Sequence, residues 1–169
     1  ARATGHEPEL MQLLDGHGGD AATRSENIAK LFRYVHKKKF EQVAHTMTLR
    51  PSVIEFVNQM RRRGFMVGLV SDSYFVAADI VRRRIFADFA MAHTISFDND
   101  VCTGHIRINP AFFDSQSKTT AICKSNVLRR FLTDPNPPAI NQTWVVGDNM
   151  NDLELMQTVR LPSIPSRQP

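Results

Sequence analysis

The sequence feature that most constrains the fold is a short apolar run at residues 143–146, which ends abruptly in Gly147-Asp148. A polar loop follows, and the pattern of residues 151–157 predicts a helix. This order is typical of a buried parallel strand that leads into a loop at its carboxyl end. Ligands bind at that edge of open α/β sheets, so we expect a ligand site in this loop.

Two carboxylates in the loop, Asp148 and Asp152, lie four residues apart, and each has an asparagine beside it. Mg²⁺ prefers oxygen ligands in near-octahedral geometry. The two carboxylates are therefore candidate metal ligands, and we expect Mg²⁺ as the cofactor. The alternative interpretation is that the polar side chains of this loop only cap the helix that follows.

A second strand with a polar carboxyl end is predicted earlier in the chain. Residues 51–63 show an apolar helical face, and Gly64 follows as a helix-terminating residue. Residues 66–70 form an apolar strand that ends at the polar segment 71–73, and residues 75–86 predict the next helix. A helix, a buried strand and a helix in this order make up one half of a doubly wound α/β unit.

The remaining pattern predicts elements at both ends of this unit. We expect a flexible loop at 15–20, a helix that begins near Ser25, a short helix at 40–45, a β-hairpin with strands 93–97 and 103–108, a helix within 118–132, and a short last strand at 161–164.

The chain has a net charge of +4 and clusters of basic residues at 37–39, 61–63, 82–84 and 129–130. Three of these clusters lie near predicted helix ends, where cations complement the helix dipole. No aromatic residues alternate with them in the way that base stacking requires. We therefore expect no nucleic-acid partner, and a mild positive field that attracts small phosphorylated molecules.

Size and composition bound the remaining choices. The 169 residues suffice for one domain, or for one core with a small appendage. No apolar run approaches the roughly 20 residues that span a bilayer, so no membrane partner is expected. Cys102 and Cys123 form no disulfide or metal framework, which predicts a reducing, cytoplasmic location.

Three polar features now follow strands or lie at helix starts: Ser71, a lysine within residues 118–124, and the loop with Asp148 and Asp152. Their chemistry is complementary. A hydroxyl can donate to a phosphoryl oxygen, a lysine can neutralise its charge, and carboxylates can hold a metal ion that binds the same group.

The order of these motifs resembles the haloacid dehalogenase superfamily, and within it the phosphoserine-phosphatase-like branch, which has a small helical cap. Residues 67–71 resemble the second motif, Lys124 the third, and residues 147–152 the fourth, and residues 97–106 resemble the stretch after the second motif. The resemblance covers roughly residues 45–165. It implies a Rossmann-like parallel sheet, with the cap at 8–47 and the α/β core at 48–169.

The resemblance also implies an activity, the Mg²⁺-dependent hydrolysis of a small phosphorylated metabolite. Ser71 and Lys124 would be the catalytic residues of this chain. They would bind the phosphoryl group together with Asp72 and Asn151.

The same resemblance implies that Asp148 would bind Mg²⁺ and that Asp152 would support it. Lys118 is the alternative to Lys124, because residues 114–118 also resemble some members of the family. The Cys123-Lys124 pair resembles phosphocholine and phosphoethanolamine phosphatases of this family.

The first motif of the family is absent from the sequence. In the family, the nucleophile is the first aspartate of an Asp-x-Asp-x-Thr motif at the end of the first strand, and the second aspartate is the general acid and base. Asp15 and Asp20, the two aspartates near the start of the chain, do not form that motif. Covalent phosphoryl transfer needs a nucleophile placed in line, so we expect no turnover by these 169 residues alone.

The family's first strand is central to its sheet, and a sheet without it would leave the backbone groups of two strand edges unpaired. We therefore expect that residue 1 is not a native start and that a preceding segment supplies the strand. The alternative is a catalytically inactive phosphate-binding or regulatory module, in which another strand fills the gap.

The residues that recognise phosphoserine in the family's cap are replaced in residues 20–28, and Asp72-Ser73 stands where the family often has two glycines. We therefore expect a small phosphomonoester other than phosphoserine as the substrate.

Overall fold

The structure is a computed structural model, and it describes residues 5–17, 21–113, 123–131, 143–147, 152–159 and 162–163. The chain forms two compact units, Ala1–Asn109 and Pro110–Pro169. In the described part of the chain, no helix is both long and apolar enough to cross a membrane.

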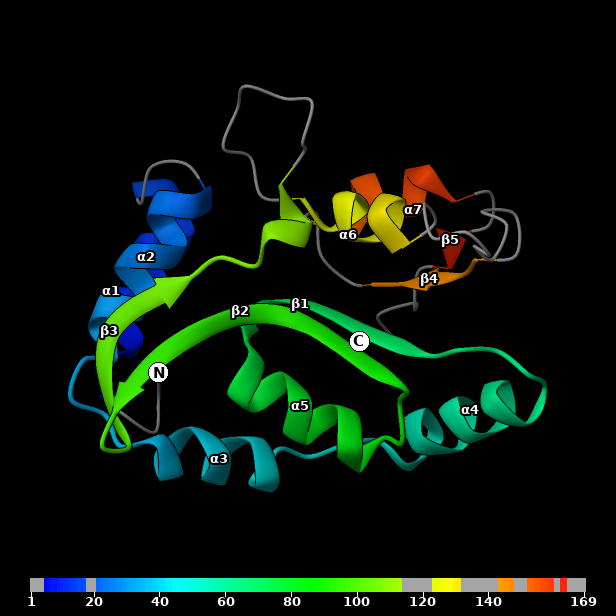
Figure 1. The fold of residues 1–169 in the computed structure, drawn as a ribbon, viewed down its shortest axis with the longest axis horizontal. Helices are drawn as coiled ribbons and strands as arrows, with labels where there is room; N and C mark the ends of the chain where they lie inside the picture. Colours follow the sequence, from blue (N-terminus) through cyan, green and yellow to red (C-terminus); the bar gives the residue numbers. More distant parts are fainter. Residues whose placement is uncertain are drawn as a thin grey trace. The chain divides into compact units, whose positions relative to one another are not determined.

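The first unit is a three-stranded sheet with helices (Figure 1). Its helices are α1 (Glu7–Gln12), the π-helix η2 (Leu13–His17), α2 (Ala21–Leu31), α3 (Lys37–Thr46), α4 (Pro51–Arg62) and α5 (Phe75–Arg84). Its strands are β1 (Gly68–Tyr74), β2 (Phe89–Asp98) and β3 (Val101–Arg107), in the order β1-β2-β3.

The parallel pairing of β1 with β2 confirms the α/β interpretation. The helix α5 connects these strands and packs against both of them, and α3 packs against α5 on the same side of the pair (Figure 1). The strand β3 pairs antiparallel with β2 and contacts α2. Helices thus flank a sheet that contains a parallel pair, as expected for one part of a doubly wound fold.

The hairpin between β2 and β3 is confirmed, with a two-residue turn at Asn99 and Asp100. Both residues have positive φ angles, +47° and +63°. Such turns match the right-handed twist of the flanking strands, and Asn and Asp tolerate this conformation better than other non-glycine residues.

The largest core of the first unit contains Ala29, Phe32, Tyr74, Ile95 and Cys102. Edge-to-face aromatic contacts hold it together; the ring of Phe40, for example, lies 5.5 Å from that of Phe32 and 5.6 Å from that of Phe97. The helices at residues 21–46 therefore share this core with the sheet. The division into a cap at 8–47 and a core at 48–169 stays a prediction.

The second unit contains η3 (Pro110–Phe112), α6 (Lys124–Phe131), β4 (Val145–Val146), α7 (Leu153–Thr158) and β5 (Pro162–Ser163). The strands β4 and β5 pair in parallel. Val145, Leu155, Met156 and Val159 form its buried cluster, against which Leu128 packs. The strand before Asp148 and the helix after it are both confirmed, although each is shorter than expected.

Three expectations about element bounds were wrong. The helix α2 begins at Ala21 rather than near Ser25, because the two alanines at its start favour helix. Of the loop expected at 15–20, residues 15–17 belong to a π-helix, Leu13–His17, that continues directly from α1, and residues 18–20 lie outside the described residues. The helix expected at 40–45 begins earlier, at Lys37, because His36 caps α3: its Nδ1 accepts a hydrogen bond from the backbone N–H of Lys38 at 3.2 Å.

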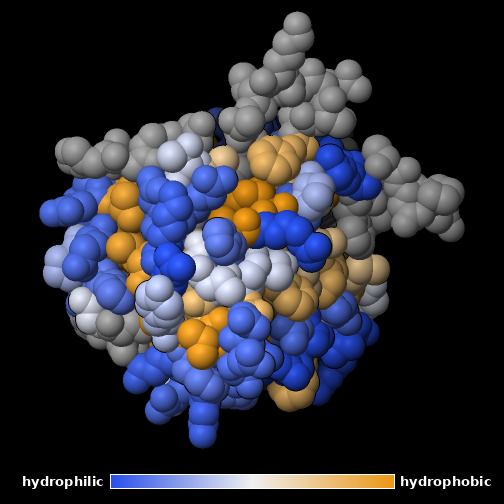
Figure 2. All heavy atoms as spheres, turned by 60° about the vertical axis from the view of Figure 1, so that its left-hand side comes forward, coloured by the Kyte–Doolittle hydropathy of each residue, from blue (hydrophilic) through white to orange (hydrophobic). Residues whose placement is uncertain are grey.

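The surface carries both apolar and hydrophilic side chains. On the face drawn in Figure 2, apolar side chains form separate groups between hydrophilic ones. More than half of the surface of an ordinary folded protein comes from apolar atoms. Exposure of a single apolar side chain is therefore no evidence of a functional site by itself.

Candidate functional site

The predicted phosphate-binding serine lies in an irregular part of β1. Val70 pairs with Met91 and Tyr74 pairs with His93, so three residues of β1 lie opposite a single residue of β2. Such a bulge bends the strand and redirects its side chains. The strand β1 continues across this bulge to Tyr74, whereas the sequence predicted that it would end before the polar segment 71–73.

Within the bulge, the hydroxyl oxygen of Ser71 accepts a hydrogen bond from the backbone N–H of Ser73 at 3.1 Å. A serine that binds a backbone group two residues further on forms a local turn. The turn holds Ser71 at the carboxyl end of the regular part of β1, the edge at which ligands bind in this class of sheet.

A buried histidine lies behind the bulge. His93 is fully buried, and its Nδ1 accepts a hydrogen bond from the backbone N–H of Asn109 at 3.2 Å. Burial lowers the pKa of His93, and the nearby carboxylate of Asp72 opposes this by raising it. His93 was not among the residues predicted for the site. The signal was the alternation of β2, which places His93 on the same face as the buried Ile95.

The two charged residues predicted for the second unit form a buried ion pair. The Nζ of Lys124 lies 2.6 Å from Oδ1 of Asp152, and the side chains are only 10% and 12% exposed. Lys124 is the first residue of α6, and Asp152 directly precedes α7. A buried charge pair is expensive to desolvate, so its presence is weak evidence that it stabilises the fold.

Gly147 makes room for the carboxylate of Asp152. A Cβ atom at Gly147 would lie 2.6 Å from both Cβ and Oδ2 of Asp152, closer than real side-chain atoms approach. The end of β4 and the start of α7 therefore touch at this position. Only glycine allows this approach without a shift of the backbone or of Asp152.

A second link joins the starts of α6 and α7. Ser125 is fully buried, and its hydroxyl donates to Oε1 of Glu154 at 2.7 Å. The Sγ of Cys123 lies 2.8 Å from the same hydroxyl oxygen. Hydrogen bonds from Cys123 and Ser125 lower the pKa of Glu154, and burial raises the pKa of the Cys123 thiol. No motif in the sequence indicated this link.

The start of α6 is also bound to η3. The side chain of Asn126 donates to the backbone carbonyl of Phe112 at 3.0 Å, and both residues are buried. The backbone N–H of Cys123 donates to the same carbonyl at 2.9 Å. Lys124 therefore projects from a helix start that several hydrogen bonds hold in place.

The structure brings together only some of the predicted site residues. Lys124 contacts Asp152 within the second unit, and Ser71 and Asp72 adjoin each other in the bulge of the first unit. Three further predicted residues, Lys118, Asp148 and Asn151, lie outside the described residues. The choice between Lys118 and Lys124 and the assignment of Asp148 to the metal stay predictions.

Among the described residues, no three His, Cys, Asp or Glu side chains are grouped closely enough to hold a metal ion. The buried carboxylate of Asp152 nevertheless offers the oxygen chemistry that Mg²⁺ prefers. It lies against Gly147, and Asp148 follows Gly147 directly in the sequence.

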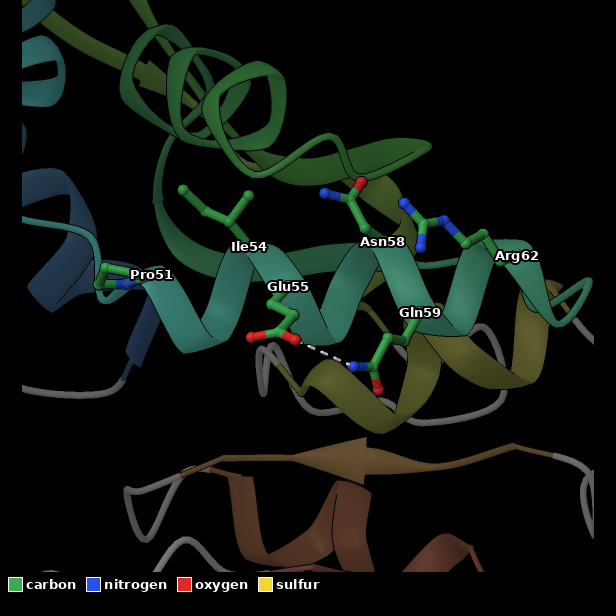
Figure 3. A pocket seen from close by; sticks show the side chains of 6 residues that line it. All are labelled: Pro51, Ile54, Glu55, Asn58, Gln59 and Arg62. Atoms are coloured by element: carbon green, nitrogen blue, oxygen red, sulfur yellow. Dashed lines mark hydrogen bonds between the residues drawn. The ribbon is translucent and has the colours of Figure 1, made fainter.

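A hollow lies along α4, away from these residues in the sequence (Figure 3). Six side chains of this helix line it: Pro51, Ile54, Glu55, Asn58, Gln59 and Arg62. Two of them, Glu55 and Gln59, are joined by a hydrogen bond of 3.3 Å. The hollow contains none of the predicted site residues. The predicted site residues that the structure describes therefore lie in two separate places, the bulge of the first unit and the buried ion pair of the second.

Comparison with known proteins agrees with this geometry. The model of the haloacid dehalogenase-like hydrolase family matches residues 4–157. A phosphoserine phosphatase of Streptomyces coelicolor is 27% identical over 174 residues, which cover 92% of this chain and 40% of that protein. The phosphoserine phosphatase SerB2 of Mycobacterium tuberculosis is 27% identical over 116 residues, or 69% of this chain and 26% of that protein. The chain thus spans half or less of these relatives.

Solved structures share the fold. A phospho-aspartyl intermediate analogue of phosphoserine phosphatase matches 95% of this chain and 74% of its own, with a TM-score of 0.74 and 17% identity. A substrate-bound phosphoserine phosphatase matches 97% of this chain and 75% of its own, with a TM-score of 0.75 and 18% identity. Since the family model covers most of the chain, the chain belongs to the haloacid dehalogenase-like hydrolase family, in its phosphoserine-phosphatase-like subfamily.

Proposed function

We propose that the protein containing this chain is a Mg²⁺-dependent phosphomonoester hydrolase that acts on a small phosphorylated metabolite. The observation that supports this most directly is the buried pair of Lys124 and Asp152, 2.6 Å apart. A lysine held beside a carboxylate in a desolvated place suits a site where a phosphoryl group and a metal ion meet. Its position in the matched family motif supports the same role.

Each residue has a role in this proposal. The ammonium group of Lys124 neutralises charge on the phosphoryl oxygens, and it limits repulsion between the phosphate and the carboxylates. The hydroxyl of Ser71 donates a hydrogen bond to the phosphoryl group. Asp72, which lies in the strand bulge, and Asn151 are the other two residues that bind the phosphoryl group in this proposal.

Asp148 and Asp152 are the residues that would hold Mg²⁺. Their carboxylates are the hard oxygen ligands that this ion prefers. When bound, the ion supplies electrostatic stabilisation to the phosphoryl oxygens in the transition state. The carboxylate of Asp152, meanwhile, orients Lys124 through the 2.6 Å contact.

The substrate belongs to the class of small phosphomonoesters. The relatives named above are phosphoserine phosphatases, which makes phosphoserine the first compound to test. Asp72-Ser73 directly after Ser71 places a carboxylate next to the phosphate-binding serine. Together with the replacement of the family's phosphoserine-recognising residues within 20–28, this departure is the reason that we propose another small phosphomonoester as the better substrate.

The test is the hydrolysis of p-nitrophenyl phosphate and phosphoserine with Mg²⁺, by the full-length protein and by the 169-residue chain. We expect turnover by the full-length protein only, because the chain contains no Asp-x-Asp-x-Thr motif. Robust turnover by the chain alone would contradict the argument about the nucleophile. Phosphate binding without turnover by the full-length protein would favour the inactive regulatory module.

A pair of variants tests the metal assignment in the full-length protein. Asp148→Asn should remove most of the activity, because it removes the charge that holds Mg²⁺. Asp100→Asn is the matched control, since it makes the same chemical change in a hairpin turn whose left-handed backbone suits asparagine. Equal rates for Asp148→Asn and the control would refute the metal site.

A further inference from the structure

Two turns of the first unit lie side by side at one edge of the sheet. One leads from α4 into β1 and the other from α5 into β2. Asp88 joins them, because its backbone N–H donates to the carbonyl of Val67 at 2.7 Å and its Oδ2 accepts from the N–H of Val67 at 2.8 Å. Arg61 also reaches Asp88, with Nε 2.9 Å from Oδ1.

These turns lie at the opposite edge of the sheet from the predicted phosphate site. Since β1 and β2 are parallel, both begin at this amino edge, as Figure 1 shows. Ser71 lies further along β1, towards its carboxyl end. Side chains at the amino edge therefore need an explanation other than phosphate binding.

Three large apolar side chains project from the two turns. Phe65, Met66 and Phe86 are 40%, 63% and 54% exposed. With the arginines at 61–63 and 82–84 they form what we call the amino-edge patch, defined by residues 61–66 and 82–86. None of the three apolar residues lines the hollow along α4 or the hollow beside the β2–β3 hairpin.

Phe86 is the most unusual member of the patch. Its φ angle is +60°, in the left-handed region that glycine adopts freely and that a bulky residue adopts only with strain. Glycine would remove the strain and would also remove an exposed aromatic ring. Tyr34 has the same combination, with a φ angle of +70° and 74% exposure, so strain and exposure point to a contact surface only where other apolar and basic side chains gather around them, as they do around Phe86.

The patch is also strongly basic. The patch contains six arginines, and the adjoining Asp79 and Asp88 reduce the excess to four positive charges. The guanidinium of Arg84 donates to the backbone carbonyl of Ala44 on α3. Asp79 pairs with Arg82 at 2.8 Å and with Arg83 at 3.3 Å. Favourable interaction with the dipoles of α4 and α5 accounts for arginines in their last turns. It does not account for three exposed apolar side chains among them.

We propose that the amino-edge patch docks on the surface of an anionic phospholipid bilayer. Basic residues are attracted to anionic headgroups, and exposed Phe and Met side chains at the tips of turns can insert at the boundary of the acyl chains. Arginine also contacts the phosphates of nucleic acids, but exposed Phe and Met side chains at the tips of turns gain more from acyl chains than from a phosphate backbone. Lipid therefore fits the composition better than nucleic acid. This inference does not depend on the proposed enzymatic function.

The experiment is co-sedimentation of the full-length protein with phosphatidylcholine vesicles, with and without phosphatidylserine. We expect binding only with phosphatidylserine, and weaker binding as salt is added. Phe86→Gly should reduce the partition coefficient by about tenfold, because burial of a phenylalanine in the acyl region contributes about this factor. Glycine suits the φ angle of this position, so misfolding would not explain the loss.

Matched variants separate charge from apolar contact. In the double variant Arg62→Glu with Arg63→Glu, vesicle binding should no longer depend on phosphatidylserine. The double variant Lys38→Glu with Lys39→Glu makes the same change of charge on α3, and it should bind vesicles several-fold better than the arginine variant. Tyr34→Gly is the control for Phe86→Gly, because it also replaces an exposed aromatic residue of left-handed backbone, with a φ angle of +70° and 74% exposure, outside the patch.

Several results would overturn the proposal. They are no binding to phosphatidylserine vesicles, unchanged binding by Phe86→Gly, or binding to duplex DNA or an acidic polypeptide in preference to vesicles. Phosphatase activity measured without vesicles should be the same in Phe86→Gly and in the unmodified protein. A result against vesicle binding can therefore be distinguished from a result against the proposed phosphatase activity.

Discussion

At the scale of single residues, the contact between Lys124 and Asp152 has the greatest consequence. Each side chain is about nine-tenths buried, so either charge would be costly without the other. Their partnership explains how a lysine from α6 and an aspartate before α7 can both be buried inside the second unit.

Replacement of one partner tests this explanation. Lys124→Met should lower the free energy of unfolding by about 3 kcal/mol, because it leaves the buried carboxylate of Asp152 uncompensated. The double variant Lys124→Met with Asp152→Leu should recover part of this loss. Urea unfolding measures both.

The control is Lys37→Met, in the exposed pair of Lys37 and Glu41, whose charged atoms are 3.9 Å apart. That change should cost less than about 1 kcal/mol. Equal losses of unfolding free energy in Lys124→Met and Lys37→Met would show that the Lys124–Asp152 pair matters no more than an exposed ion pair.

Gly147 provides a second test at this scale. Gly147→Ala should destabilise the protein by about 1–3 kcal/mol, because the new Cβ would overlap the side chain of Asp152. In Gly64→Ala, by comparison, the new Cβ meets no atom within 4 Å, and its cost comes only from the φ angle of +84°. A nuclear magnetic resonance signal from the Lys124 side chain should shift in Gly147→Ala and not in Gly64→Ala.

At the scale of elements, local backbone geometry places the functional candidates. The bulge in β1 holds Ser71 in a turn, and the hairpin turn at Asn99 and Asp100 sets the register between β2 and β3. This turn also binds α3, because the carbonyl of Asp100 accepts a hydrogen bond from the N–H of Lys37 at 2.7 Å.

The hairpin turn can be tested by two substitutions at one position. Asp100→Val should lower the free energy of unfolding by about 1–2 kcal/mol, because a β-branched residue is strained at a φ of +63°. Asp100→Gly should be nearly neutral, since glycine adopts this φ without strain. Thermal or chemical unfolding of both variants measures the difference, and equal stabilities would contradict the turn geometry.

At the scale of the whole molecule, the buried His93 links stability to pH. Its pKa is lowered on folding, so the unfolded chain binds protons more readily than the folded one at mildly acidic pH. Stability should therefore be fully present above the ordinary histidine pKa of about 6.5 and should fall as the pH drops below it.

His93→Asn tests this link, because the Oδ1 of asparagine can replace Nδ1 as the acceptor for Asn109. The loss of unfolding free energy between about pH 7.5 and about pH 5.5 should be smaller in this variant than in the unmodified protein. His105→Asn, at an exposed histidine of β3, should keep the full loss. The same pH dependence in all three proteins would exclude His93 as its source.

Much of the fold could be predicted from the sequence. The apolar strand before Ser71, the hairpin around Asn99 and the helix–glycine–strand order at Gly64 are local patterns. Each depends on residues close together in the chain. The family motifs are also short local patterns, and their order along the chain was enough to predict roles for Lys124 and Asp152.

The rest required the tertiary structure. The sequence by itself determined which residue types stand at the carboxyl ends of strands, because strand and turn preferences act over a few residues. Only the structure decided that three residues of β1 oppose one of β2, that Asp152 lies against Gly147, and that Ser125 meets Glu154. Contacts between residues far apart in the chain depend on how complete elements pack, and no local pattern encodes that packing.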